Sequence, residues 1–100
     1  MTHVRTCIEQ GRYLDTRHAL ERQVERAINR NEILYVLKNG YHEKKKDKFD
    51  ELYQAWNYAV RGKTLDRREL RVVISFEDAS GMLLITAIEL KKSGRVSLWK

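Results

Sequence analysis

Apolar residues in the first half of the chain recur at helical spacing, which predicts two to three helices. The first ends before Gly11, because glycine accommodates the left-handed end of a helix. Another opens where Asn29 is followed three residues later by Glu32, which is the spacing of a capping box. This helix ends at the Asn-Gly pair of residues 39–40.

The middle helix, predicted from a cap at Asp15 or Thr16 to about residue 27, has two unlike sides. Its apolar residues follow the pattern of one buried stripe, and they are Leu20, Val24, Ala27 and Ile28. The nearly opposite side carries a basic ridge of His18, Arg22 and Arg26. This ridge fits phosphate binding with a titratable imidazole at one end. The alternative is a solvated face in ion pairs with the glutamates of the same helix.

In the second half of the chain the hydrophobic period changes to two. Alternation predicts strands at 56–61 and 70–76, and a strand that is apolar on both faces, and therefore central in the sheet, at 82–88. The Asp-Ala-Ser-Gly segment 78–81 is typical of a hairpin connection. The stretch 41–55 is ambiguous, since 41–45 fits a strand while 49–55 could equally be helix.

The order of these elements predicts an α+β fold. We expect two to three N-terminal helices packed on one face of a three- to four-stranded antiparallel sheet. With 100 residues and no Gly/Ser linker, the chain has the size of one domain over 1–100, in which 91–100 is a basic tail.

The charge balance adds a kind of partner to this picture. Twenty Lys and Arg against fourteen Asp and Glu leave a net charge of +6 and a pI near 9.6, which favours a nucleic acid, an acidic protein or a lipid surface. One cysteine forms no internal disulfide, and no apolar run reaches the ~20 residues of a membrane span. We therefore expect a soluble, cytoplasmic protein that is not a membrane partner.

A second basic segment follows the helices. Residues 41–48 combine four lysines with His42, a group that titrates near neutrality, so the segment fits an RNA groove as well as a mobile charged loop. Aromatic residues interleaved with this charge suit base stacking, although Trp56 is better explained as core. The spacing of His and Cys matches no zinc site, and no glycine loop for phosphate is present, so we expect no metal and no small-molecule cofactor.

Several segments together resemble a bacterial domain family of unknown function. The resemblance covers about 16–90 and rests on the His-x-x-x-Arg-x-x-x-Arg helix that starts at His18, on residues 41–49 and 56–64, and on the last two strands. Members of this family are regarded as relatives of the metal-independent ribonuclease toxins that include RelE-like proteins and barnase. Some are encoded beside small zinc-finger antitoxins.

This resemblance implies a toxin-like, metal-independent endoribonuclease of a toxin–antitoxin module, which cleaves RNA through attack of its own 2′-OH. His18 would be the base or acid, Arg71 would hold the scissile phosphate and Thr86 would donate to a phosphate oxygen. The residues expected to position RNA are Arg22, Arg26, His42, Lys45 and Lys63. The alternatives are a non-catalytic basic module for RNA or an acidic protein partner, and a structural accessory subunit.

Overall fold

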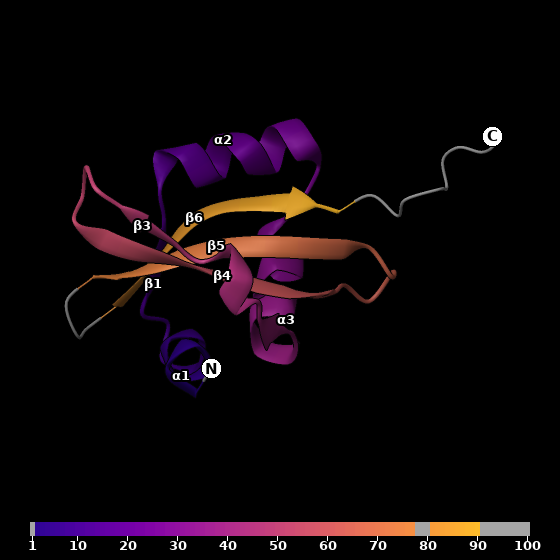
Figure 1. The fold of residues 1–100 in the computed structure, drawn as a ribbon. Coiled ribbons are helices and arrows are strands. Elements are labelled where there is room, and N and C mark those ends of the chain that lie inside the picture. Colours follow the sequence, from indigo (N-terminus) through magenta and orange to yellow (C-terminus); the bar gives the residue numbers. More distant parts are fainter. Residues whose placement is uncertain (1, 78–80, 91–100) are drawn as a thin grey trace.

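The computed structural model describes residues 2–77 and 81–90, which form a sheet with helices on both sides (Figure 1). The helices are α1 (Thr2–Glu9), α2 (Arg17–Arg26), α3 (Arg30–Asn39) and the short 3-10 helix η1 (Lys44–Lys46). The strands are β1 (Tyr13–Asp15), β2 (Tyr41–His42), β3 (Lys48–Asp50), β4 (Ala55–Lys63), β5 (Glu69–Glu77) and β6 (Gly81–Glu89). The α+β class and the N-terminal position of the helices are confirmed. The expected turn residues 78–80 and the tail 91–100 lie outside the described residues.

Local signals place the helix ends as expected. The side chain of Thr16 accepts a hydrogen bond from the Ala19 amide and caps α2. Asn29 and Glu32 form the capping box of α3, with each side chain accepting from the other residue's amide. Gly11 has the positive φ of 68° that lets the chain turn after α1.

The sheet is larger than the sequence pattern indicates. Among the described residues it has six strands in the order β1-β6-β5-β4-β2, with β3 paired to β4 beside β2. All neighbours are antiparallel except β1 and β6, which run parallel with Tyr13 opposite Met82. Strand β6 lies between β1 and β5, so its interior position is confirmed. The strands β1, β2 and β3 have two or three residues each, too few for a visible alternation.

The helices do not share one face, which differs from the expected arrangement. Figure 1 shows α1 and α3 on one side of the sheet and α2 on the other. The cause is β1, which joins α1 to α2 and lies along the edge of the sheet beside β6. The chain therefore passes around this edge between the two helices, and the fold has three layers.

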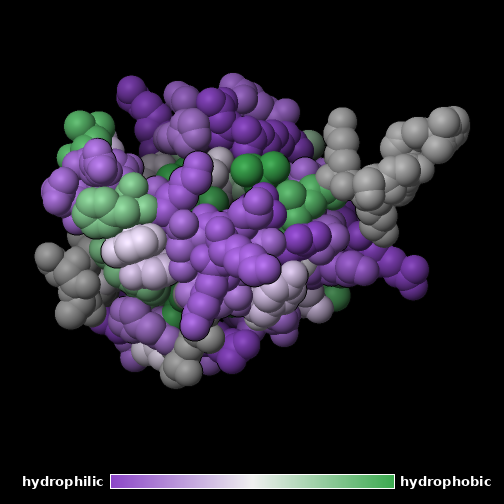
Figure 2. All heavy atoms as spheres, viewed as in Figure 1, coloured by the Kyte–Doolittle hydropathy of each residue, from purple (hydrophilic) through white to green (hydrophobic). Residues whose placement is uncertain are grey.

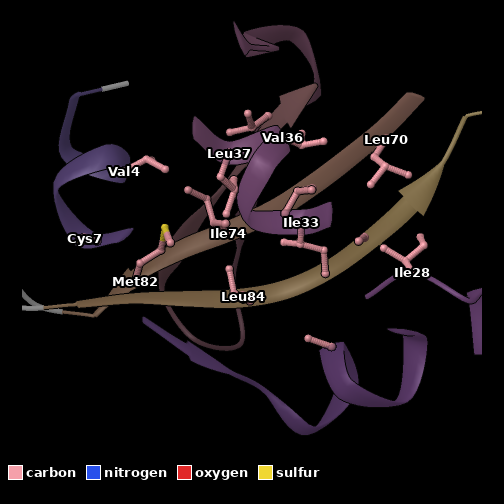
Figure 3. Close-up of a cluster of buried hydrophobic side chains, with 14 residues drawn as sticks. Val4, Cys7, Ile28, Ile33, Val36, Leu37, Leu70, Ile74, Met82 and Leu84 are labelled. Carbon is pink, nitrogen blue, oxygen red and sulfur yellow. The ribbon is translucent and has the colours of Figure 1, made fainter. Parts of the chain in front are cut away.

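The main core lies between the sheet and the layer of α1 and α3 (Figure 3). Strand β5 alternates, with Leu70, Val72 and Ile74 fully buried on the core side. The core side chains of α1 and α3 are Val4, Cys7, Ile33, Val36 and Leu37. Burial of each such aliphatic side chain contributes about 1.5–3 kcal/mol, so this face accounts for most of the apolar stabilisation.

The end of α3 lies directly against β4 at two glycines. A Cβ at Gly40 would lie 2.4 Å from the carbonyl oxygen of Arg61, and a Cβ at Gly62 would lie 2.9 Å from the Cα of Gly40. Both distances are shorter than van der Waals contact, so the backbones approach each other here because neither residue has a side chain.

The stripe expected to be buried on α2 is largely exposed. Leu20 is 47% exposed and Val24 is 83% exposed, and only Ile28, beyond the helix end, joins the core. The side of α2 that faces the sheet instead carries Ala19, which is buried, and Arg26, which donates to the Ala87 carbonyl at 2.7 Å. Strand β1 pairs with β6 only at residues 82–84. At the two ends of α2, the cap residue Thr16 donates to the Leu84 carbonyl and Arg26 donates to the Ala87 carbonyl. These bonds to the β6 backbone orient the helix on the sheet.

Candidate functional site

A hollow of about 490 Å³ lies between the start of α2, the β3–β4 hairpin and the sheet. Figure 1 shows this hairpin rising on the same side of the sheet as α2. The polar residues that line the hollow are Thr16, His18, Asp50, Tyr53, Asn57 and Ser75. Its volume falls within the range of about 300–1,000 Å³ that is typical of ligand pockets. The hollow is therefore large enough for a nucleotide.

Thr16 holds the α2 wall of the hollow in place. Its backbone amide donates to the Leu84 carbonyl at 3.1 Å, and its hydroxyl donates to the same oxygen at 3.0 Å while capping the helix. Because α2 begins at residue 17, these bonds position His18 in the first turn relative to β6. His18, an exposed residue, thus lines the hollow from a helix end fastened to the sheet.

The opposite wall is the turn between β3 and β4. One carboxylate oxygen of Asp50 accepts from the amides of Leu52 at 3.0 Å and Tyr53 at 3.2 Å, which closes an Asx turn. Tyr53 is 75% exposed and lines the hollow from this turn. The Ser75 hydroxyl donates to the Trp56 carbonyl at 3.1 Å and joins the hairpin to β5. The aromatic ring is therefore presented on a braced turn.

Three polar groups in the hollow are available to a ligand. Within the part of the chain that the structure describes, the imidazole of His18, the phenol of Tyr53 and the amide of Asn57 have no hydrogen-bond partner. Polar side chains that face a concave surface without internal partners are suited to bind polar atoms of a ligand. His18, expected from the sequence to be catalytic, is one of them.

Arg71 does not line this hollow. It lies on the same face of β5 as Ser75, four residues away, which is about 13 Å at about 3.3 Å per residue. Its guanidinium donates to Glu43 through Nε at 2.7 Å and Nη2 at 3.2 Å, and Arg61 donates to the same carboxylate at 3.1 Å. The Arg71 guanidinium, and then that of Arg61, hold the pKa of Glu43 below its ordinary value against the opposing effect of burial. The positive charge of Arg71 is thus compensated by Glu43.

Thr86 and Arg26 also lie outside the hollow. Arg26 Nη1 lies 3.5 Å from the Thr86 hydroxyl and donates to the Ala87 carbonyl. These contacts fasten the last turn of α2 to β6. The structure therefore does not bring His18, Arg71 and Thr86 together as the three expected catalytic residues.

Arg22 follows His18 by one turn of α2, on the same side of the helix. The two residues are four apart on the helix, a spacing that places their Cβ atoms about 5–6 Å from each other. Arg22 forms an ion pair with Glu25, whose side chain is 60% exposed. Exposed pairs of this kind contribute about 0–1 kcal/mol, so little free energy holds Arg22 to Glu25.

The other residues expected to contact RNA, namely His42, Lys45 and Lys63, do not line the hollow. His42 Nε2 pairs with Asp47 Oδ2 at 2.8 Å, and Asp47 Oδ1 accepts from the Ala59 amide at 3.0 Å. This arrangement fills the gap along β4 between its pairings with β2 and β3. Lys45 on η1 and Lys63 at the end of β4 are exposed. These two lysines add positive surface rather than a wall of the site.

Trp56 is not a core residue, contrary to the expectation from the sequence. It is 49% exposed and packs edge-on against Phe49 with ring centroids 5.6 Å apart. Figure 2 shows apolar surface at the end of the molecule where the β3–β4 hairpin lies, beside strongly polar surface. The reason is the length of β4, whose first residues pair with β3 rather than with β5 and extend past the helices.

Sequence reasoning did not single out Asn57, Ser75 or Asp50. Asn57 and Ser75 occupy the polar positions of two correctly predicted alternating strands, so a signal for their shared face was present. Asp50 lies in the segment that fitted both helix and strand, and its role depends on a turn that no periodicity indicates.

Fold and hollow together define a small α+β domain with an open polar site. The chain belongs to the family described as domain of unknown function (DUF4258), whose family model matches residues 16–89. This range runs from the cap of α2 to the last residue of β6 and includes every residue named above for the hollow. Comparison with curated proteins and with solved structures gives no match to the chain.

Over residues 2–77 and 81–90, no three side chains of His, Cys, Asp or Glu gather closely enough to hold a metal ion. None of the described helices has the length and apolar character needed to span a membrane.

Proposed function

We propose that this protein binds RNA in the hollow and cleaves it without a metal ion, through attack of the 2′-OH on the adjacent phosphorus. The observation that carries the proposal is the free imidazole of His18 in a solvent-reachable hollow, one helical turn from the guanidinium of Arg22. The net charge of +6 supports a polyanionic ligand.

Each group has a defined part in this reaction. His18 takes the proton of the 2′-OH while the bond from that oxygen to phosphorus forms. Arg22 stabilises the negative charge that develops on the phosphorane oxygens. The bond to the 5′-oxygen then breaks, and this oxygen takes a proton from water, which the open hollow admits. The products are a 2′,3′-cyclic phosphate and a 5′-hydroxyl.

The proposal includes a toxin role with a protein antitoxin in the cytoplasm. Its support is the resemblance over about 16–90, since the family that matches residues 16–89 is described only as a domain of unknown function. A short reading frame beside the gene, with paired Cys-x-x-Cys motifs, is the expected genetic context. An isolated gene would count against the toxin role and leave the RNA chemistry standing.

A non-catalytic RNA-binding module is the second candidate, and one observation favours it. Among the described residues that line the hollow, none is Lys or Arg, and Arg71 is compensated by Glu43. Without enough cationic stabilisation, an RNA held in the hollow is bound and not cleaved.

One experiment separates the two candidates. Purified protein is incubated with single-stranded RNA in the presence of a chelator, and the products are examined for 2′,3′-cyclic phosphate ends. His18→Ala is expected to lower the cleavage rate about 10²–10⁴-fold, whereas His3→Gln, a matched change on α1 outside the hollow, keeps it. RNA binding without cleavage by the unaltered protein would establish the module instead.

A further inference from the structure

We propose that the hollow receives one unpaired base, stacked on Tyr53 and hydrogen-bonded by Asn57, so that the ligand of this site is single-stranded RNA. The inference rests on the proposed function in one respect, namely that RNA is the ligand. Beyond that function, it specifies that the RNA is single-stranded and that Tyr53 and Asn57 select this form.

Tyr53 is suited to stacking by its position and its bracing. The ring is mostly exposed, yet the two amides held by Asp50 fix the backbone of its turn. A base that stacks on such a ring meets a surface that is already in place, and every base has a π face, so stacking tolerates any sequence. Tyr53 therefore supplies affinity without base preference.

Asn57 is suited to contact the edge of the same base. It lies on β4 two residues after Ala55, another lining residue, and its amide has no partner within the described residues. The amide offers a donor beside an acceptor. The Watson–Crick edge of each of the four bases also offers a donor beside an acceptor, so Asn57 accepts any base whose edge is free. In a duplex these edges are occupied and the bases are stacked inside, so paired RNA is excluded.

An aspartate at the same position changes the outcome in a specific way. A carboxylate has only acceptors. Guanine alone has two neighbouring donors on its Watson–Crick edge, N1–H and the N2 amino group. Asn57→Asp is therefore expected to convert a site that is indifferent to base identity into one that selects guanine.

The test measures binding separately from cleavage. His18→Ala protein, which keeps the RNA intact, is titrated against fluorescein-labelled 12-nucleotide oligouridylates with one central A, C, G or U, and fluorescence anisotropy gives Kd. We expect the four single strands to bind within about 3-fold of each other and duplexes of the same sequences to bind at least 10-fold more weakly. Adding Tyr53→Ala is expected to weaken single-strand binding about 10-fold.

The decisive variant is Asn57→Asp on the same background. Its Kd for the guanine-containing strand is expected to stay unchanged, and its Kd for each of the other three strands is expected to rise about 10-fold. Asn31→Asp brings the same charge change outside the hollow, and Tyr41→Ala removes another exposed tyrosine, so both serve as matched controls and should bind like the parent. Circular dichroism confirms that each variant is folded.

The possible results bear differently on the two proposals. Equal binding of duplex and single strand, or an Asn57→Asp variant with unchanged affinity for all four strands, overturns this inference and leaves RNA binding in place. An absence of binding to any RNA overturns both.

Discussion

The carboxylate of Glu43 is predicted to be a structural centre that joins β2 to β4 and β5, and Glu43→Gln tests this. The carboxylate accepts three hydrogen bonds, two from Arg71 and one from Arg61. An amide keeps one oxygen, loses the net charge and turns two N–H donors toward guanidinium groups that are donors themselves.

The expected loss follows from these contacts. Each hydrogen bond to a charged group contributes about 1.5–3 kcal/mol, and at least one is lost. The side chain of Glu43 is 14% exposed and that of Arg61 is 30% exposed, so solvent weakens the effect. We expect the free energy of unfolding at pH 7 to fall by about 2 kcal/mol, which corresponds to a Tm lower by about 8–16 °C for a domain of this size.

The pH dependence has a definite sign. The pKa of Glu43 is lowered from 4.5, chiefly by the hydrogen bond from Arg71, so the folded state favours the ionised form. The advantage of the native chain over Glu43→Gln is complete above pH 4.5 and is lost as the pH falls through the lowered, folded-state pKa. The two unfolding free energies should therefore converge in acid.

Urea unfolding followed by circular dichroism, repeated between pH 7 and pH 3, measures the loss of unfolding free energy and its dependence on pH. Glu21→Gln, on the exposed face of α2, is the control and should change stability by no more than about 0.5 kcal/mol. A double-mutant cycle with Arg71→Ala should give a coupling of about 0.5–3 kcal/mol. A loss at pH 7 below about 0.5 kcal/mol, or a difference that does not vary with pH, would refute this account of the Glu43 site.

Two further predictions concern packing. Gly40→Ala should destabilise the fold by about 1–3 kcal/mol, because its Cβ would meet the backbone of Arg61 and neither backbone can move aside easily. A Tm that changes by less than about 2 °C, which corresponds to a free-energy change below roughly 0.5 kcal/mol, would contradict this. On α2, Ala19→Leu should cost about 1–3 kcal/mol, whereas Val24→Lys should cost less than about 0.5 kcal/mol, as measured by urea unfolding; the reverse order would mean that the apolar stripe faces the sheet after all.

The features that were predicted correctly depend on residues close together in the sequence. Thr16 caps the helix that starts one residue later, and Asn29 and Glu32, three residues apart, form a capping box. The strands β4 and β5 were recognised because apolar residues recur at every second position of their sequence. Such signals need no knowledge of the rest of the fold.

The orientation of α2 was not predictable in this way. A helical pattern with Leu20 and Val24 on one side favours burial of that side, which is a sound expectation for an isolated amphipathic helix. The actual orientation depends on the β6 carbonyls of Leu84 and Ala87, more than sixty residues later in the chain. Hydrogen bonds to exposed strand backbone outweighed the hydrophobic pattern here.

In the candidate site, too, local features were predictable and long-range contacts were not. His18 was singled out by its residue type and its place on a basic helix, and it does line the hollow. Arg71 was chosen because it occupies a polar position on its strand, but its carboxylate partner Glu43 lies 28 residues earlier. Whether a charged side chain is available to a ligand depends on such a partner, which sequence spacing alone does not reveal.

The parallel contact between β1 and β6 sets the order in which the protein can assemble during synthesis. The hydroxyl of Thr16 bonds to a carbonyl 68 positions later in the chain. A ribosome that adds about 5–20 residues per second needs several seconds to translate that interval. Until β6 has emerged from the ribosome, α2 has no strand on which to dock. The hollow lined by His18 therefore forms late, after translation of nearly the whole domain.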